Sequence, residues 1–420
     1  MDKFEKHLIE SCLYIYISLI IMNSINFIGI ITTIGSVGKL LFSLIVIISS
    51  VLFFDKGKIK LKFNSLNEWL ICIISILFFA VVFEVINRSN INLIANLAFP
   101  IYFIFYFSIT KLFIRKSNHN WTLRTVDLIK FRIFHVFRNT LFVNFIFWFI
   151  IAIAARINMF EEGGGFGGFF QDEIHFGFFV VTGFLISFYF LNNTIYKDTS
   201  FYNVALLCTY AFIALFTSRN ALLIIATTVA YYYSVGQIKN KFYKILFFSL
   251  ITTIICIGLM FNNLTKGDLI SFTSGRFQIW IFAFEKMYYD NIMLIGSGLF
   301  NLNDVILESH RGIGFYYLDD LKGLSFHNSY VEMLAAGGLI LIFFFVRIII
   351  KSWKSLSYVE KSIFIGILTG ALFESFLVQP FMLVTVFFYL MIILNNITIK
   401  ITGATIDSSN IPKTNLIPNL

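Results

Sequence analysis

The stretch NSYVEMLAAGGLILIFFFVRIII, residues 328–350, decides the class of this protein. It is apolar over most of its length and long enough to cross the hydrocarbon core of a bilayer, which takes roughly 20 residues of α-helix. His327 stands directly before it, where a long polar segment, residues 263–326, ends. The sequence therefore predicts a membrane-spanning helix that begins beside a titratable side chain.

Apolar stretches of similar length recur along the whole chain. Of its 420 residues, 58% are hydrophobic and only 13% are charged, whereas a soluble domain is about one-quarter charged. The short segments of alternating polarity that build a membrane β-barrel are absent. We therefore predict an all-α polytopic membrane protein with about 12 transmembrane helices. The predicted spans are residues 8–31, 37–54, 69–86, 94–114, 139–155, 175–193, 201–217, 220–236, 245–262, 328–350, 362–378 and 381–397.

Basic residues gather in alternate connections between these spans. They follow the second, fourth, eighth and tenth spans, at residues 56–62, 115–138, 239–244 and 347–361. Because loops rich in Lys and Arg stay in the cytoplasm, this pattern predicts that both termini are cytoplasmic. The same pattern accounts for the net charge of +9 without a nucleic-acid partner.

We expect the chain to have three parts. Residues 1–262 hold about nine N-terminal spans, residues 263–327 form a large, partly helical outer loop between the ninth and tenth spans, and residues 328–420 hold the C-terminal spans and a cytoplasmic tail. A connection as long as this loop is usually functional. Residues 121–138 are amphipathic and are predicted to lie as a helix in the cytoplasmic headgroup layer. Residues 32–36 are predicted to form a short outer connection.

Three basic residues are predicted on the outer side. An arginine at the bilayer centre costs about 2.5–3.5 kcal/mol, so we expect Arg219, between two apolar runs, at the membrane rim. The guanidinium of Arg276 offers a rigid fork of donors that matches phosphate oxygens, and the imidazole of His327 can accept a proton near neutral pH. Each also has a structural interpretation: Arg219 as an interfacial anchor, Arg276 as a solvated loop residue, and His327 as a hydrogen-bonded structural histidine.

Other residues are candidates for supporting roles. Glu374 is an ionisable residue inside a predicted span near its outer end, and we expect it to pair with one of the arginines. Asn328 or Glu332 could orient the ring of His327. The remaining supporting candidates are Trp280, Tyr330 and Arg156.

Paired carboxylates occur in the outer loops at residues 172–173 and 319–320. Such pairs can hold a divalent cation through their oxygens, but they are more often solvated surface charge. We predict no metal site and no cofactor.

Five short motifs follow one another between about residues 215 and 340. They are Ser218-Arg219-Asn220-Ala221, Gly275-Arg276 followed by Trp280, Gly296-Ser297-Gly298, His327-Asn328-Ser329-Tyr330, and Gly337-Gly338. In their order and common sidedness they resemble the O-antigen polymerase and O-antigen ligase superfamily of bacterial inner membranes. The first half of the chain is similar to that superfamily only in hydropathy and number of spans.

The resemblance implies a multi-pass protein of the bacterial inner membrane that acts at the periplasmic face. Its substrate would be a glycan linked through pyrophosphate to undecaprenol, with membrane lipids around it and a chain-length regulator and a flippase as candidate partners. The resemblance likens Arg219 and Arg276 to the arginines that bind the donor, and His327 to the catalytic histidine. It implies a glycosyltransferase that needs no metal.

The motifs resemble polymerases, which pass the growing glycan to the next carrier-linked unit, more than ligases, which pass the finished glycan to the lipid A core. The O-antigen ligase therefore remains the alternative. A polysaccharide flippase or transporter is a more distant one, because transporters tend to have repeated halves and broken helices, and the sequence indicates neither.

Overall fold

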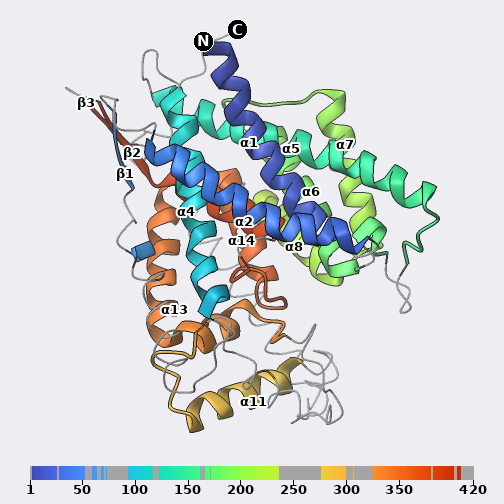
Figure 1. The fold of residues 1–420 in the computed structure, drawn as a ribbon, viewed down its shortest axis with the longest axis vertical. Helices are drawn as coiled ribbons and strands as arrows, with labels where there is room; N and C mark the ends of the chain where they lie inside the picture. Colours follow the sequence, from blue (N-terminus) through green and yellow to red (C-terminus); the bar gives the residue numbers. More distant parts are fainter. Residues whose placement is uncertain are drawn as a thin grey trace.

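The structure is a computed structural model, and helices make up most of it (Figure 1). It describes residues 2–25, 28–52, 59–63, 68–70, 72, 93–116, 123–160, 166–170, 172–235, 276–298, 306, 325–379, 382–401 and 404–407. Four helical stretches are long and apolar enough to cross a membrane: Gly29–Leu52, Asp127–Ala154, Glu173–Asn192 and Ser329–Ser355. The prediction of a mostly helical membrane protein is confirmed at this level. The number of 12 spans stays a prediction, since residues 245–262 lie outside the described part.

Eleven helices are described. The helices are α1 (Asp2–Asn23), α2 (Gly29–Leu52), α4 (Leu93–Lys116), α5 (Leu123–Ala154), α6 (Glu173–Asn192), α7 (Phe201–Ala214), α8 (Arg219–Ala230), α11 (Arg276–Tyr289), α13 (Ser329–Ser355), α14 (Tyr358–Gly370) and α15 (Leu383–Asn395). A 3-10 turn, η1 (Gly168–Phe170), precedes α6, and a π-helical turn, η2 (Tyr231–Val235), follows α8.

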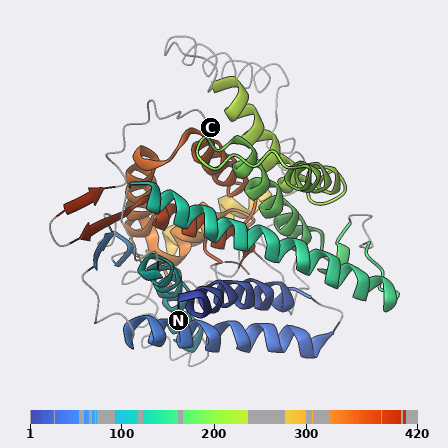
Figure 2. The ribbon, with the colours of Figure 1, turned by 90° about the horizontal axis from the view of Figure 1, so that it is seen from above.

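A small antiparallel sheet accompanies the helices. Its strands β1 (Ile59–Phe63), β2 (Ile397–Ile401) and β3 (Ala404–Asp407) lie in that order, and Ile59 pairs with Ile401. Figure 2 shows β2 and β3 at the edge of the molecule. This sheet was not predicted from the sequence. Its β1–β2 pairing joins residues far apart in the chain, whereas β2 and β3 form a local hairpin.

The predicted connection at residues 32–36 is wrong, because these residues lie inside α2. The chain turns instead between α1 and α2, which lie side by side (Figure 2). Gly35, within this range, lets the two helices approach closely. A Cβ atom on Gly35 would lie 2.3 Å from the backbone nitrogen of Asn23.

The predicted headgroup helix at residues 121–138 is also wrong. Residues 123–154 form one continuous helix, α5, of 32 residues. The buried guanidinium of Arg138 is held inside the fold by Asp198, between α6 and α7, at 2.7 Å and by Asn203, in the first turn of α7, at 2.8 Å. These partners compensate for the burial of the charge, so Arg138 faces protein.

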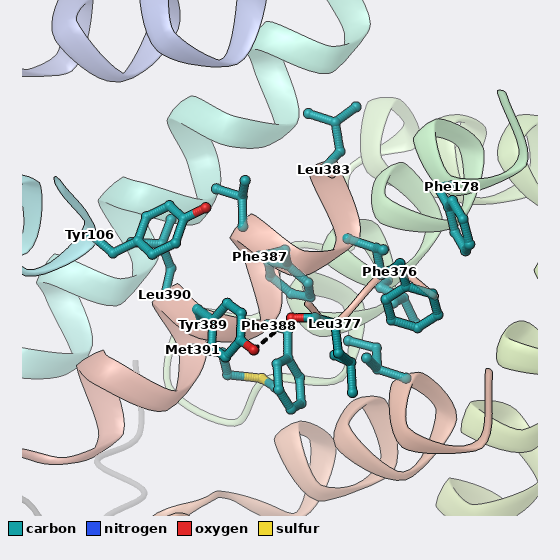
Figure 3. Packing of buried hydrophobic residues seen from close by; sticks show 14 of the residues in the cluster. Tyr106, Phe178, Phe376, Leu377, Leu383, Phe387, Phe388, Tyr389, Leu390 and Met391 are labelled. Atoms are coloured by element: carbon teal, nitrogen blue, oxygen red, sulfur yellow. Dashed lines mark hydrogen bonds between the residues drawn. The ribbon is translucent and has the colours of Figure 1, made fainter. Parts of the chain in front are cut away.

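The core is built around α15, whose 13 residues are all buried. A helix that is apolar on every side is expected at the centre of a bundle. Two of its polar groups reach the connection that precedes it: Thr385 Oγ1 donates to the carbonyl of Phe376 at 2.6 Å, and Tyr389 Oη donates to the carbonyl of Leu377 at 2.7 Å (Figure 3). The ring of Phe376 packs edge-on against Phe178 of α6, with centroids 4.9 Å apart. The core therefore fixes residues 376–377 in place.

Several helix ends meet at one end of the bundle. Asn220, at the start of α8, donates to the carbonyl of Gly370 at the end of α14 at 3.2 Å. The backbone N–H of Ser329, at the start of α13, donates to the carbonyl of Ala371 at 2.9 Å. We call this the α13-start end. In Figure 1, α11 lies crosswise at this end, away from the N-terminus.

Helix α13 is broken at Gly338, which has φ 63° and ψ −166°. The sequence analysis expected no broken helix, and this expectation is wrong. The segment after α11 closes around the break: Leu339 N–H donates to the carbonyl of Met293 at 3.0 Å, and Ser297 and Gly298 N–H groups donate to the carbonyls of Ala335 and Ala336, each at 2.8 Å. Non-helical backbone at membrane depth is tolerated where protein satisfies its polar groups. The motifs at residues 296–298 and 337–338 thus form one interlock.

Gly338→Ala should destabilise this interlock. Its backbone conformation is nearly restricted to glycine and would cost about 1–3 kcal/mol with a side chain, and the new Cβ would lie 2.2 Å from the carbonyl carbon of Leu294. We expect a lower melting temperature of the purified protein in detergent. Gly29→Ala is the control, since nothing lies within 4 Å of its Cβ position. Equal melting temperatures for the two variants would contradict the interlock.

Candidate functional site

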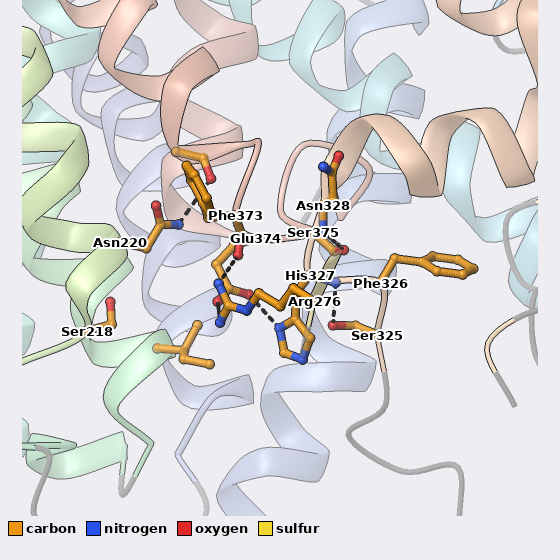
Figure 4. Close-up of polar contacts among 12 residues, drawn as sticks. Ser218, Asn220, Arg276, Ser325, Phe326, His327, Asn328, Phe373, Glu374 and Ser375 are labelled. Carbon is orange, nitrogen blue, oxygen red and sulfur yellow. Dashed lines mark hydrogen bonds and ion pairs between the residues drawn. The ribbon is translucent and has the colours of Figure 1, made fainter. Parts of the chain in front are cut away.

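Three segments from distant parts of the chain meet at the α13-start end. They are the first turn of α11, residues 325–328 before α13, and the non-helical connection 371–379 between α14 and α15. Figure 4 shows the side chains of Arg276 and His327 reaching Glu374 from different segments. We call these three residues the Glu374 cluster.

The two oxygens of Glu374 have different partners. Arg276 Nη2 lies 2.9 Å from Oε1, and His327 Nδ1 lies 3.2 Å from Oε2. Arg276 Nη1 also donates to the carbonyl of Phe373 at 2.6 Å. The prediction that Glu374 pairs with one of the arginines agrees with this geometry, and the same carboxylate also contacts the histidine.

Burial differs across the cluster. The side chain of Glu374 is 8% exposed, whereas those of Arg276 and His327 are each 26% exposed. A buried carboxylate needs partners to offset its lost hydration. The cation and the imidazole therefore lie over a buried anion and remain accessible to a molecule that approaches this end of the bundle.

Glu374 does not lie inside a helix, as the predicted span 362–378 required. Helix α14 ends at Gly370, and the chain continues without helical structure to residue 379. The carbonyls of this connection and of Gly370, the last residue of α14, are bonded by groups from four other helices or their ends. The acceptors and donors are Gly370 with Asn220, Ala371 and Glu374 with Ser329, Phe373 with Arg276, Phe376 with Thr385, and Leu377 with Tyr389.

His327 has an unusual backbone conformation, with φ 47°. Only a few per cent of residues other than glycine have positive φ, and such residues are often functional. Its N–H donates to Ser325 Oγ at 3.2 Å. The residue is thus held in a tight turn directly before α13.

Asn328 does not orient the ring of His327, as had been considered. Its side chain is the N-cap of α13, where Oδ1 accepts the N–H groups of Tyr330 at 2.9 Å and Val331 at 3.1 Å. An asparagine at this position satisfies donors that the first helical turn leaves free. Its own N–H donates to Ser375 Oγ at 3.1 Å, which ties the start of α13 to the residue after Glu374.

Trp280 and Tyr330 hold the cluster from two sides. Trp280 Nε1, one turn along α11 from Arg276, donates to the carbonyl of Phe326 at 2.8 Å. Tyr330 Oη donates to the carbonyl of Leu368 in α14 at 2.9 Å. Both hydrogen bonds support neighbouring backbone, so these two predicted residues have positioning contacts.

The other two predicted arginines are not part of the cluster. Arg219 is the first residue of α8 and is exposed, between Ser218 and Asn220, which Figure 4 shows beside the cluster. Arg156 is exposed just beyond the end of α5, with φ 54°. Neither guanidinium has a hydrogen bond or ion pair within the described part of the chain.

The carboxylates considered for a metal site have other roles where they are described. Asp172 caps α6 and lies 3.0 Å from His175 Nδ1. Burial acts to raise the pKa of Asp172, but hydrogen bonds from His175 and from two backbone N–H groups outweigh it and lower this pKa. Residues 319–320 lie outside the described residues. In the described ranges, no group of three metal-ligating side chains occurs.

Sequence reasoning missed the groups that build the connection around Glu374. These are the carbonyl of Phe373 and the hydroxyls of Ser325, Ser329 and Ser375. The hydroxyls of Ser329 and Ser375 leave a trace in the sequence, because each stands beside a candidate site residue. The carbonyl leaves none, since every residue has one.

Comparison of the chain with models of known protein families found no match, and neither did comparison with curated proteins. The resemblance to the polymerase and ligase superfamily therefore depends on the short motifs and on the arrangement of their residues.

Trp280→Phe should loosen the turn that holds His327. The substitution keeps an aromatic ring and removes the donor to Phe326, a hydrogen bond whose net contribution is about 0.5–1.5 kcal/mol. We expect faster hydrogen–deuterium exchange in a peptide that covers residues 325–330. Trp148→Phe removes a comparable donor, to Asn144 at 3.2 Å within α5, and should leave that peptide unchanged. Exchange unaffected by Trp280→Phe would show that the turn does not depend on Trp280.

Proposed function

We propose that this protein polymerises oligosaccharide repeat units that are carried on polyprenyl pyrophosphate. In this proposal it transfers the growing glycan to the next carrier-linked unit at the periplasmic face of a bacterial inner membrane. The observation that carries the proposal is the Glu374 cluster, which joins a guanidinium and an imidazole at one end of a bundle of apolar helices.

Arg276 is suited to hold the pyrophosphate of the donor. A guanidinium has five N–H donors, and hydrogen bonds to Phe373 and Glu374 occupy two of them. The others can bind phosphate oxygens, and the side chain is partly exposed. As the glycosidic bond breaks, negative charge grows on the pyrophosphate, and fixed donors stabilise that charge in the transition state.

Arg219 would add a second positive charge. It is exposed at the first turn of α8, and the N-terminal end of a helix favours anions through its free N–H groups. Asn220 links this turn to the end of α14, four residues before Glu374. This arrangement supports a donor site that extends from α8 to α11.

His327 is suited to act as the general base. A sugar hydroxyl is a weak acid, and removal of its proton during attack accelerates such reactions by typically 10²–10⁴-fold. Nδ1 of His327 is engaged by Glu374, and the ring is partly exposed. The other ring nitrogen can therefore serve the acceptor sugar.

The membrane orientation is part of the same proposal: about 12 spans, both termini cytoplasmic, and the cluster on the outer side. Basic residues at the far end of the bundle support it. Lys351 and Arg347, near the end of α13, both pair with Glu68, and Lys130 pairs with Glu360 at the start of α14. A lipid-linked donor also requires a site at the membrane surface.

Two alternatives differ in what they do with the glycan. An O-antigen ligase would use the same donor chemistry but pass the glycan to lipid A core. A transporter would move the lipid-linked sugar without lengthening it, and a broken helix is a feature of such proteins. Here the backbone N–H and C=O groups next to the break at Gly338 form hydrogen bonds with residues 293–298, so these groups do not bind a substrate.

A deletion strain distinguishes these functions through its lipopolysaccharide bands. Loss of a polymerase should leave lipid A core that carries a single repeat unit, whereas loss of a ligase should leave none. Purified protein in vesicles should lengthen a lipid-linked repeat unit. Translocation of that lipid without lengthening would refute the proposal in favour of a transporter.

His327→Asn should abolish long glycan chains in the complemented deletion strain, with a loss of about 10²–10⁴-fold in the transfer rate. Asparagine accepts a positive φ more readily than most residues, so the turn is preserved while the base is lost. His175→Asn is the matched control, since that histidine also contacts a carboxylate, Asp172, but outside the cluster. Wild-type chain lengths in the His327→Asn strain, at normal protein abundance, would rule out His327 as the base.

Arg219→Lys should reduce the transfer rate, because lysine keeps the charge but loses the bidentate fork of donors. The loss of one hydrogen bond between charged groups lowers the rate by about 10- to 100-fold. The rate is measured in vesicles as a function of donor concentration. Arg347→Lys, at the far end of the bundle, is the control. Full activity of Arg219→Lys would leave Arg219 the role of an interfacial anchor.

A further inference from the structure

The contacts of Glu374 indicate which ring nitrogen of His327 carries the proton. An ion pair with Arg276 at 2.9 Å requires the ionised carboxylate, and an ionised carboxylate only accepts hydrogen bonds. The contact between Oε2 and His327 Nδ1 at 3.2 Å is then a hydrogen bond only if Nδ1 carries the proton. In neutral imidazole this leaves Nε2 as the nitrogen that can accept a proton.

We infer that Glu374 is a positioning residue that holds His327 in the tautomer with a free Nε2 and couples it to Arg276. This inference depends on the proposed function, in which His327 is the base and Arg276 binds the donor. The carboxylate touches neither substrate. It acts through the two side chains that do, and a single carboxylate fixes the distance between them.

The transfer step forms one bond and breaks one. The acceptor hydroxyl oxygen forms a bond to the anomeric carbon of the donor, and its proton moves to Nε2 of His327. The bond between that carbon and the pyrophosphate oxygen breaks, and its electron pair leaves with the lipid pyrophosphate, held by Arg276. The imidazolium that forms lies against the anionic Glu374, which stabilises it as the carboxylate of a catalytic triad does.

The surroundings of Glu374 favour this role over a packing role. Its backbone carbonyl accepts from Ser329 Oγ at 2.7 Å, and Asn328 N–H bonds the adjacent Ser375 at 3.1 Å. The start of α13 therefore forms hydrogen bonds with both Glu374 and the residue that follows it. Glu332, one turn along α13, is another carboxylate near this region, and its buried Oε2 has no hydrogen-bond partner in the described part of the chain.

A second histidine–carboxylate pair offers a control within the same chain. His175 Nδ1 lies 3.0 Å from Asp172 Oδ2, a contact similar to that in the cluster. Asp172 also accepts the N–H groups of Ile174 and His175, each at 2.8 Å, as the cap of α6. This pair has no arginine partner within the described part of the chain, and we assign it a capping role.

The test uses Glu374→Gln in the full-length protein. The glutamine is nearly the same size, but its amide can donate to Nδ1, which favours the opposite tautomer. We expect kcat for chain extension in vesicles to fall by about 10³–10⁴-fold, as for the equivalent change in a catalytic triad. Glu374→Asp should recover part of the activity, and Asp172→Asn should leave kcat unchanged.

The second readout is the tautomer of His327, measured by ¹⁵N NMR of the histidine rings in detergent, with His327→Asn to assign the signal. We expect the proton on Nδ1 in the wild-type protein and on Nε2 in Glu374→Gln. A purely structural role of Glu374 would not move this signal. If Glu374→Gln fails to accumulate, the wild-type spectrum decides alone.

The outcomes separate this inference from the proposed function. A wild-type protein that carries the proton on Nε2, or a Glu374→Gln variant with wild-type kcat, would overturn the inference while glycan extension remained intact. A wild-type protein with the proton on Nδ1 but no chain extension would overturn the proposed function, and the tautomer assignment would stand.

Discussion

Backbone that leaves the helical conformation inside an apolar bundle must find other partners for its N–H and C=O groups. The end of α14 and the connection that follows it meet this constraint through carbonyls that accept from Asn220, Arg276, Ser329, Thr385 and Tyr389. These donors come from α8, α11, α13 and α15. The need to satisfy this short stretch of backbone therefore brings together the helices that carry the candidate site.

The same connection places a carboxylate where it is buried by its neighbours. Removal of one partner leaves a buried charge with less compensation. Loss of either Arg276 or His327 would therefore disturb Glu374, which both side chains contact. Arg276 and His327 come from opposite ends of the predicted outer loop, residues 263–327. Their meeting places the first turn of α11 against the turn that precedes α13.

The glycines have a role that complements this closure. Residues 293–298 form backbone hydrogen bonds with α13 around its break, and a Cβ on Gly296 would lie 2.4 Å from the carbonyl carbon of Ala336. The segment after α11 is thereby fixed to the helix that follows His327. Arg276 and His327 are held together twice, once through the carboxylate and once through backbone hydrogen bonds.

The sequence by itself determined the class of the protein, because a membrane-length apolar run has few alternatives to a helix. It also singled out Glu374, as an ionisable residue inside a predicted span, and Arg276 and His327, as basic residues on the predicted outer side. Only the tertiary structure decided that one carboxylate serves both basic side chains, that Asn328 is a helix cap, and that α13 breaks at Gly338. Those outcomes depend on which carbonyls and N–H groups lie within reach after packing, and local patterns of polarity carry no information on contacts between distant segments.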